Sequence, residues 1–274
     1  MKARAVMALL IVYFLLPFWW LLVAATKDND GLFGSAPLWF ADVHVVDNLR
    51  LLFTHEDGIY LRWLANSAMY AVVCGAGATA VAALAGYAFA KLRFPGRNAL
   101  FALLLGLIMV PATALVLPTY LLMAQAGLID SVWAVILPSL LNPFGVYLLR
   151  VYVHDSVPDE MLEAARIDGA GELRVFRSVA LPAMRPALVT VLLFTMVASW
   201  NNFFLPLVML SDQDLYPLTV GLRSWYQSAT IGNGGPALFN IIVTGALVAI
   251  LPLIAAFLLL QRYWRGGLTI GALK

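Results

Sequence analysis

The stretch Glu160–Pro186, EMLEAARIDGAGELRVFRSVALPAMRP, is the most charged part of a very apolar chain. Of the 274 residues, 62% are hydrophobic and only 12% are charged. Acidic residues gather in and just before this stretch: Asp155, Asp159, Glu160, Glu163, Asp168 and Glu172. The sequence on either side is apolar, and its composition indicates whether most of the chain lies in water or in lipid.

The hydrophobic share exceeds the roughly half that is usual for soluble domains, which favours lipid as the solvent. A hydrocarbon core of about 30 Å requires about 20 apolar helical residues per crossing. Six runs of about this length lack Asp, Glu, Lys, Arg and His: Val6–Ala25, Leu64–Ala90, Ala99–Met123, Val132–Leu149, Ala187–Met209 and Ala237–Leu260. The sequence therefore predicts an all-α integral membrane protein with six transmembrane helices in a single domain, residues 1–274.

The first run has features of a secretory signal, because Lys2 and Arg4 precede it and Val23-Ala24-Ala25 resembles a cleavage site. It is, however, longer than the roughly 7 to 15 apolar residues of a signal sequence. We therefore expect it to be retained as the first span.

The distribution of Lys and Arg over the two sides of six spans predicts the orientation. Thirteen lie on the side of the N-terminus: Lys2, Arg4, Lys91, Arg93, Arg97, Arg150, Arg166, Arg174, Arg177, Arg185, Arg262, Arg265 and Lys274. Four lie on the other side: Lys27, Arg50, Arg62 and Arg223. Because the cytoplasmic side carries the excess of positive charge, both termini and the charged loop are predicted to be cytoplasmic.

Two polar segments are then expected on the extracytoplasmic side of the membrane. In the segment Thr26–Arg62, Gly31, Gly34 and Pro37 predict an interruption of regular helix, and one short helix is expected around Val46–Phe53. The second segment, Ser211–Pro236, is rich in glycine and aromatic residues.

The charged loop has the signals of a short helix. Ser156 and Asp159 resemble a capping box, and Pro158 suits a first helical turn. Gly169 can adopt the left-handed conformation that ends a helix. A helix over residues 157–170 is predicted between spans 4 and 5, followed by a second amphipathic piece that stops before Pro182.

At helical spacing, Val157, Met161, Ala164 and Ala165 are predicted to form one mostly apolar face. Paired alanines permit the close approach of a partner backbone, and Glu163 offers a charge to a basic residue across the contact. A helix lying on lipid is the alternative. The acidic residues offset the arginines, and anionic headgroups disfavour that balance, so docking on a protein is the favoured interpretation.

The pattern Glu163-Ala-Ala-x-x-Asp168-Gly169-Ala170, followed by Phe176, Leu181-Pro182 and Pro186, resembles the EAA loop of permease subunits in bacterial ABC importers. In that family the loop forms a coupling helix that sits in a cleft of a cytoplasmic ATPase subunit. The resemblance implies coupling residues at Glu163, Ala164, Ala165, Asp168, Gly169 and Ala170, with Phe176 and Pro182 positioning the helix against the membrane domain.

Three further segments resemble the carbohydrate branch of that family, specifically the smaller maltose-type permease subunit: Ala90–Arg97, Trp200-Asn201-Asn202-Phe203 and Gly267–Lys274. Asn202 departs from the family pattern, in which an acidic residue is common at that place, so the substrate class is expected to stay broad. The sequence does not identify the sugar.

The resemblance also implies partners: a second, related permease, two cytoplasmic ATPase subunits and an extracytoplasmic substrate-binding protein, assembled in the bacterial plasma membrane. The tail Gly271–Lys274 is expected to reach toward the ATPase, and Ser211–Pro236 toward the binding protein. A nucleic-acid partner is not indicated.

The chain lacks the sequence Gly-x-x-x-x-Gly-Lys-Ser/Thr, so it has no phosphate-binding loop with which to hydrolyse ATP. No cofactor or metal is expected on this chain, and ATP with Mg²⁺ is expected on the partner ATPases. The glycines of the second run, Gly75, Gly77 and Gly86, are interpreted as sites of close helix packing rather than as a dinucleotide fingerprint.

Two other classes of function are alternatives to an importer subunit. An ion-coupled secondary transporter usually keeps ionisable residues inside its spans, and these six have none, although sodium coupling through neutral oxygens stays open. A membrane enzyme would need a nucleophile with a base, or clustered metal ligands. His44 and His55 fall in an outer segment and His154 at the inner boundary, where surface positions are the default interpretation. No catalytic residue is assigned.

Within the membrane, Trp200, Asn201 and Asn202 are the candidates for lining a translocation path, late in the fifth run. Neutral hydroxyls of a sugar would suit amide and aromatic groups. Hydrogen bonding between helices is the structural alternative for both asparagines.

Overall fold

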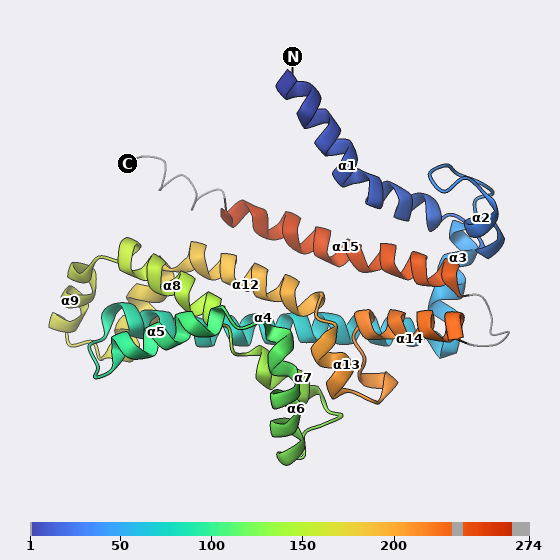
Figure 1. Cartoon of the computed structure of the whole chain (residues 1–274). Helices are drawn as coiled ribbons and strands as arrows, with labels where there is room; N and C mark the ends of the chain where they lie inside the picture. Colours follow the sequence, from blue (N-terminus) through green and yellow to red (C-terminus); the bar gives the residue numbers. More distant parts are fainter. Residues whose placement is uncertain (1, 232–237, 265–274) are drawn as a thin grey trace. The chain divides into compact units, whose positions relative to one another are not determined.

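The computed structural model describes residues 2–231 and 238–264, and within these ranges every regular element is helical. The described chain forms two compact units (Figure 1). The first combines the described parts of Met1–Asn66 and Tyr216–Ile254, and the second those of Ser67–Leu215 and Ala255–Lys274. The predicted all-α class is therefore confirmed for the described residues.

The first unit is built from short helices and from parts of two long ones. Its elements are α1 (Lys2–Ala24), α2 (Asn29–Gly34), α3 (Val45–Thr54), a 3-10 turn (His55–Gly58), the start of α4 (Ile59–Lys91), α14 (Leu218–Ile231) and most of α15 (Phe239–Trp264).

The second unit contains the rest of α4 and the helices that follow it. These are α5 (Arg97–Ile108), a 3-10 turn (Ala112–Leu115), α6 (Val116–Gln125), α7 (Val132–Ser139), α8 (Pro143–Ser156), α9 (Asp159–Ile167), α10 (Glu172–Val175), a π-helical turn (Phe176–Ala180), α11 (Leu181–Ala183), α12 (Arg185–Trp200), α13 (Phe204–Met209) and a 3-10 turn (Gln213–Leu215).

Four helical segments of the described chain are long and apolar enough to cross a membrane: Arg4–Ala24, Val45–Lys91, Val132–Ser156 and Phe239–Leu259. Two bent pairs raise this to as many as six, if each pair is one span. They are Arg97–Ile108 with Ala112–Gln125, bent by 103°, and Glu172–Ala183 with Arg185–Trp200, bent by 80°.

Two of the predicted apolar runs are not continuous helices. Run 99–123 breaks at Pro111, whose extended backbone (ψ 127°) and missing N–H end α5 before the next helical turn begins. Run 187–209 breaks after Trp200, where α12 ends, and α13 begins at Phe204. The expectation that Asn201 and Asn202 lie inside a span helix is therefore wrong: they lie in the break.

In the first unit, the expected short helix around Val46–Phe53 is confirmed as α3. The expected interruption is wrong at Gly31, which lies within α2, but the helix ends at Gly34, before Pro37. The Asp28 carboxylate accepts a hydrogen bond from the backbone N–H of Gly31 at 2.7 Å. This N-terminal cap stabilises a helix that the glycines alone would not favour.

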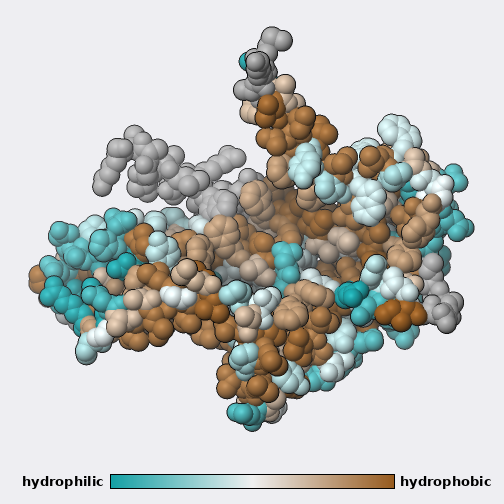
Figure 2. Space-filling view, in the orientation of Figure 1, coloured by the Kyte–Doolittle hydropathy of each residue, from teal (hydrophilic) through white to brown (hydrophobic). Residues whose placement is uncertain are grey.

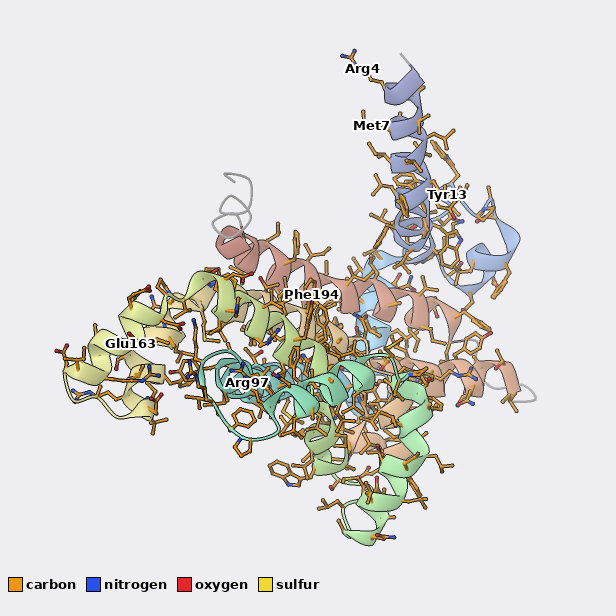
Figure 3. All side chains as sticks on the ribbon, turned by 60° about the vertical axis from the view of Figure 1, so that its left-hand side comes forward. Arg4, Met7, Tyr13, Arg97, Glu163 and Phe194 are labelled. Atoms are coloured by element: carbon orange, nitrogen blue, oxygen red, sulfur yellow. The ribbon has the colours of Figure 1, made fainter. Side chains whose placement is uncertain are left out.

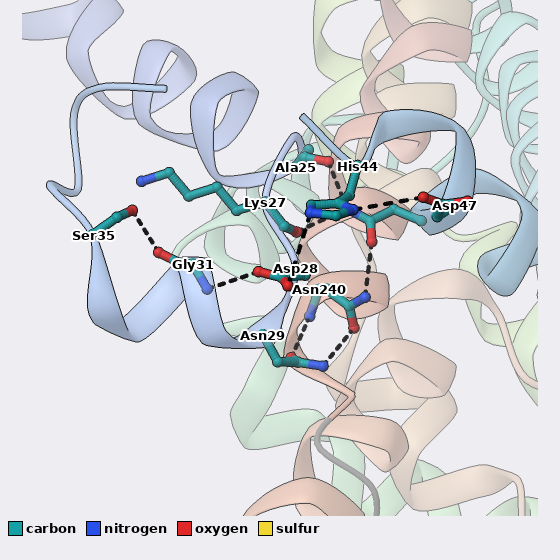
Figure 4. A network of polar contacts seen from close by, with 10 residues as sticks. Ala25, Lys27, Asp28, Asn29, Gly31, Ser35, His44, Asp47 and Asn240 are labelled. Carbon is teal, nitrogen blue, oxygen red and sulfur yellow. Dashed lines mark hydrogen bonds and ion pairs between the residues drawn. The ribbon is translucent and has the colours of Figure 1, made fainter. Parts of the chain in front are cut away.

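An asparagine cluster, defined as Asn29, Asn48 and Asn240, joins three segments of the first unit (Figure 4). The Asn240 side chain accepts a hydrogen bond from Asn29 Nδ2 at 3.1 Å and donates one to Asn48 Oδ1 at 2.8 Å. Asn48 Nδ2 in turn donates to the backbone oxygens of Ala25 and Lys27. Asn48 and Asn240 are buried, so these amides stabilise the packing only because their hydrogen bonds are made.

In the second unit, close packing at the predicted glycines is confirmed. A Cβ atom added at Gly86 of α4 would lie 2.9 Å from Leu149 Cβ and 3.0 Å from the backbone nitrogen of Arg150, both on α8. One added at Gly75 would lie 2.5 Å from Met196 Cγ on α12. The absence of side chains at these positions therefore lets α4 approach its neighbours closely.

Candidate docking loop and pathway segment

The charged loop contains α9, but the helix starts later than the capping signal indicates. Ser156 is the last residue of α8, and Pro158 occupies the N-cap position of α9 without a side-chain cap. The expected capping box is therefore wrong. Val157 is buried and has an extended backbone between the two helices. Ser156 is therefore separated from the first turn of α9 and cannot cap it. Instead, the negative charges of Asp159 and Glu160 in the first turn interact favourably with the helix dipole.

Gly169 ends α9 as predicted. It has φ +83°, in the left-handed region that favours glycine. Its N–H donates to the Arg166 oxygen, and the N–H of Ala170 donates to the Ala165 oxygen, each at 3.0 Å. This pair of bonds is a Schellman motif, so the Asp-Gly-Ala part of the sequence pattern is the stop signal of the helix.

The two faces of α9 differ from the prediction. Leu162 is 1% exposed and belongs to the core of the second unit, together with Val157 and, less deeply, Ala165. Met161, by contrast, is exposed. The predicted apolar face of Val157, Met161, Ala164 and Ala165 is thus split, because Leu162 occupies the core position one residue away from Met161.

The outer surface of α9 is a mixture of apolar and acidic groups. Ile167 is 86% exposed, and Met161 and Ala164 are exposed with it. Glu163, labelled in Figure 3, is exposed on the same short helix, and Asp168 is exposed at its C-cap. Exposed isoleucine and methionine beside carboxylates form the kind of surface that contacts a partner protein.

After Gly169 the chain turns into α10 and a π-helical turn. Phe176 is buried and packs against Tyr87 of α4 with ring centroids 5.2 Å apart. The prediction that the helical piece stops before Pro182 is wrong, because α11 continues through it. The N–H of Leu181 donates to the Phe176 oxygen five residues earlier. Pro182 therefore stands in the first turn of a new segment, where its missing N–H costs little.

Three polar contacts tie the loop to α4 and to itself. Lys91 Nζ lies 2.6 Å from Asp159 Oδ1. Arg166 donates to Glu172 through Nε at 2.7 Å and through Nη2 at 3.3 Å. The Tyr87 hydroxyl lies 3.4 Å from Glu172 Oε2. None of these three contacts was predicted from the sequence.

These contacts shift the pKa values of Asp159 and Arg166. The hydrogen bond from Lys91, reinforced by its positive charge, lowers the pKa of Asp159 below its ordinary value. The hydrogen bond to Glu172 raises the pKa of Arg166. Both shifts favour the charged forms of Asp159 and Arg166.

An open hollow of about 710 Å³ borders the loop, lined by Gly171, Glu172, Leu173, Arg174, Arg177 and Ser178. Hydrophilic residues gather over the end of the second unit that carries α9, and hydrophobic residues cover the part that carries α5 and α6 (Figure 2). The loop is thus a hydrophilic end of a unit whose α5 and α6 surface is largely apolar.

The pathway candidates lie at the break between α12 and α13. Trp200 is buried, whereas Asn201 is exposed and Asn202 is partly exposed. Asn201 Nδ2 donates to the Val197 oxygen of its own helix at 2.9 Å. Asn201 therefore presents the more accessible of the two side-chain amides.

A second loop contact was also missed by sequence reasoning. Asp130, at φ 58°, accepts hydrogen bonds from the backbone N–H groups of Ser211 at 2.8 Å and Asp212 at 2.9 Å. These bonds lower its pKa. They join the turn before α7 to the segment after α13.

The histidines of the first unit have separate surroundings. His44 lies 3.6 Å from Asp47 and 3.9 Å from Asp28. His55 lies 3.5 Å from Glu56 and packs edge-on against Trp225. Among the described residues, no group of three or more His, Cys, Asp or Glu side chains is arranged to hold a metal ion.

Comparison with known proteins places this geometry in a family. Residues 75–265 match the profile of the binding-protein-dependent transport system inner membrane component family. The arabinooligosaccharides transport system permease protein AraQ of Halalkalibacterium halodurans is 36% identical, over 84% of this chain and 79% of its own length. The sn-glycerol-3-phosphate transport system permease protein UgpE of Pectobacterium atrosepticum is 31% identical, over 90% of this chain and 87% of its own length.

A solved structure shares the fold. It is a chain in the crystal structure of a bacterial ABC transporter involved in the import of the acidic polysaccharide alginate, with a TM-score of 0.83 and 22% identity over 96% of this chain and 95% of that one. The profile match and two relatives above 30% identity together show the family of this chain. The chain belongs to the family of binding-protein-dependent transport system inner membrane components.

Proposed function

We propose that this chain is a permease subunit of an ATP-driven importer for carbohydrates or related polar solutes. It forms half of the translocation pathway in the bacterial plasma membrane, and a second, related permease forms the other half. The chain performs no catalysis: ATP and Mg²⁺ bind to two partner ATPase subunits in the cytoplasm. An extracytoplasmic binding protein delivers the solute.

The surface of α9 is the observation that carries this proposal. A short helix anchored by Leu162 exposes Ile167, Met161 and Glu163 to water, and it ends at a left-handed glycine. In our proposal the coupling residues are Glu163, Ala164, Ala165, Asp168, Gly169 and Ala170, with Phe176 and Pro182 setting the position of the helix. The ATPase cleft covers the exposed apolar side chains, and a basic residue of the ATPase pairs with Glu163.

The proposed topology is one domain with six spans and both termini in the cytoplasm. Four helical segments and two bent pairs supply enough apolar length for six crossings. Met7 and Tyr13 of α1 project from the helix, and its apolar side chains are exposed from Val6 to Trp20, as contact with lipid or with the second permease requires (Figure 3). The loop with α9 then lies on the side predicted to be cytoplasmic.

The translocation path is proposed to include Trp200, Asn201 and Asn202. The exposed amide of Asn201 supports this proposal. Trp200 is buried at the end of α12, next to Asn201. Contacts with the binding protein are proposed for Ser211–Pro236, of which residues 232–236 lie outside the described residues. The tail Gly271–Lys274, proposed to reach the ATPase, also lies outside them.

The solute class rests on the relatives and on the character of the path. The names of two relatives specify arabinooligosaccharides and sn-glycerol-3-phosphate, both rich in hydroxyl groups. Amide side chains such as Asn201 suit hydroxyl groups through neutral hydrogen bonds. We therefore propose a polar, hydroxyl-bearing solute.

The proposal is tested by isolating the complex. The tagged chain is expressed in its native host and purified in mild detergent, and the co-purifying proteins are identified by mass spectrometry. We expect an ATPase, a second permease and a binding protein. Repeated recovery of the chain alone, as a stable protein, would contradict the proposal.

The docking role of α9 is tested in the same complex by Glu163→Lys. Reversal of a charge at a protein contact weakens that contact strongly, so recovery of the ATPase and solute uptake are both expected to fall by at least about tenfold. Asp155→Lys, an equal change of charge at the exposed end of α8, is the matched control and should retain both. Normal uptake in Glu163→Lys would exclude this role.

A further inference from the structure

We infer that α9 is clamped to α4 at both of its ends, and that this clamp transmits movement of the docked loop into the span helix. The α9 clamp is defined as Tyr87 and Lys91 on α4 with Asp159, Arg166 and Glu172 on the loop. The inference rests on the proposed function, because it describes how docking on an ATPase reaches the membrane. The clamp residues position α9 and do not themselves contact solute or nucleotide.

The first attachment holds the start of α9. Lys91 is the last residue of α4, and Asp159 is the first residue of α9. Their atoms Nζ and Oδ1 lie 2.6 Å apart. The Lys91 side chain is only 7% exposed although Asp159 is 71% exposed. The ammonium is therefore covered by protein, and its interaction with Asp159 is less screened than that of a fully exposed pair.

The second attachment holds the end of α9 through an intermediate residue. Arg166, in the last turn of α9, makes two hydrogen bonds to Glu172, the first residue of α10. Glu172 in turn lies within 3.4 Å of the hydroxyl of Tyr87, which is buried and packed against Phe176. A two-bond contact between guanidinium and carboxylate restrains orientation as well as distance.

The two attachments act on one face of α4. Tyr87 and Lys91 are four residues apart, so their side chains lie one above the other on that helix. A short helix that is held at its first and its last turn cannot tilt relative to α4 without breaking one of the attachments. Contacts at only one end would leave it able to pivot.

Beyond the clamp, α4 is tightly packed. One residue before Tyr87, the backbone of Gly86 lies so close to α8 that a Cβ atom there would approach Leu149 Cβ to 2.9 Å. A shift of the clamped end of α4 therefore has to move α8 as well, because well-packed helices do not deform continuously. The clamp connects the hydrophilic loop to two helices of the second unit.

The inference is tested with the purified complex in proteoliposomes, by measuring solute moved per ATP hydrolysed. The variants are Asp159→Asn, Glu172→Gln and the double variant, with Glu160→Gln as a matched control, because Glu160 is exposed on α9 and outside the clamp. We expect each single change to lower the ratio by about threefold and the double change by about tenfold, as for a coupling free energy shared by two attachments. The control is expected to retain the wild-type ratio.

Two further measurements separate transmission from other roles. Recovery of the ATPase with the complex should match the wild type, since the outer surface of α9 is unchanged. The exchange of charge in Lys91→Glu with Asp159→Lys should recover most of the coupling that either single change removes. A variant complex that loses its ATPase, or an exchange that recovers nothing, would overturn the inference.

Failure of the clamp and failure of the proposed function give different results. If the wild-type complex has no ATPase, or hydrolyses ATP without moving solute, the proposed function fails and the clamp with it. If the wild type is coupled and the double variant has the same ratio of solute to ATP, the clamp alone is wrong. A reduced ratio with a retained ATPase supports both.

Discussion

The asparagine cluster of the first unit and the α9 clamp of the second both join segments that are distant in sequence, but with different chemistry. The cluster uses neutral amides, and its members Asn48 and Asn240 are buried. The clamp uses charged groups, and Asp159 and Glu172 remain exposed to water. The comparison shows how burial decides what a polar contact contributes.

A buried amide cannot exchange its partner for water, so breaking one bond of the cluster leaves another group unsatisfied. The exposed carboxylates of the clamp can be hydrated when a contact opens, so they are not left unsatisfied as a buried amide would be. We therefore expect the cluster to determine stability. The clamp is expected to affect coupling while changing the free energy of unfolding little.

The largest effect is predicted for Asn240→Leu. The substitution leaves Asn48 Oδ1 without the donor it has in the structure and inserts an apolar side chain among buried polar groups. A loss of about 2 to 4 kcal/mol in the free energy of unfolding is expected, from the unsatisfied acceptor and the changed packing. Thermal unfolding in detergent measures it, and an unchanged midpoint would show that the cluster does not stabilise the unit.

A smaller effect is predicted at the end of α9. Gly169→Ala places a Cβ atom at φ +83° and should cost about 1 kcal/mol locally. Gly171→Ala is the matched control, since Gly171 has φ −69° and open space around it. Uptake should fall in the first variant only, because α9 then presents its outer surface in an altered position. Equal uptake in both would contradict a role for the left-handed glycine.

Asn201→Leu extends the comparison to an exposed asparagine. Its amide donates to a carbonyl of its own helix, so the change in stability is expected to stay within about 0.5 kcal/mol, in contrast to Asn240→Leu. If Asn201 lines the path, the KM for uptake should rise while the complex assembles normally. Loss of assembly would instead favour a packing role.

The smallest effect concerns pH. The pKa of Asp159 is lowered by Lys91, so the contribution of this pair is present above the ordinary Asp pKa and is lost as the pH falls through the lowered value. Asp159 therefore stays ionised between about pH 6 and pH 8, and the ratio of solute to ATP should not change through its carboxylate. A titration of that ratio checks it, and a transition near neutral pH that disappears in Asp159→Asn would contradict this assignment.

Part of this structure was predictable because it depends on neighbours in sequence. The helical class follows from apolar runs of span length, and the end of α9 follows from Gly169, whose conformational freedom is a local property. The loop pattern Glu-Ala-Ala-x-x-Asp-Gly-Ala was enough to indicate the family to which the chain belongs. The short helix α3 was expected on similar local grounds.

The rest depends on how helices pack. Periodicity alone did not show that Leu162 rather than Met161 faces the core, because both are apolar residues between Glu160 and Glu163 and only the position of α9 against its neighbours distinguishes them. The breaks after Ile108 and Trp200 divide runs whose apolar composition is continuous. Their signals, Pro111 and the paired asparagines, are compatible with a continuous span as well.

By itself the sequence determined the solvent, the helical class, the stop at Gly169 and the family, since composition and local backbone preference act over a few residues. Only the tertiary structure decided which polar groups meet. Asn29 and Asn240 are 211 positions apart, and Lys91 and Asp159 are 68 apart. Such pairs form when packing brings their helices together, and no local propensity encodes that approach.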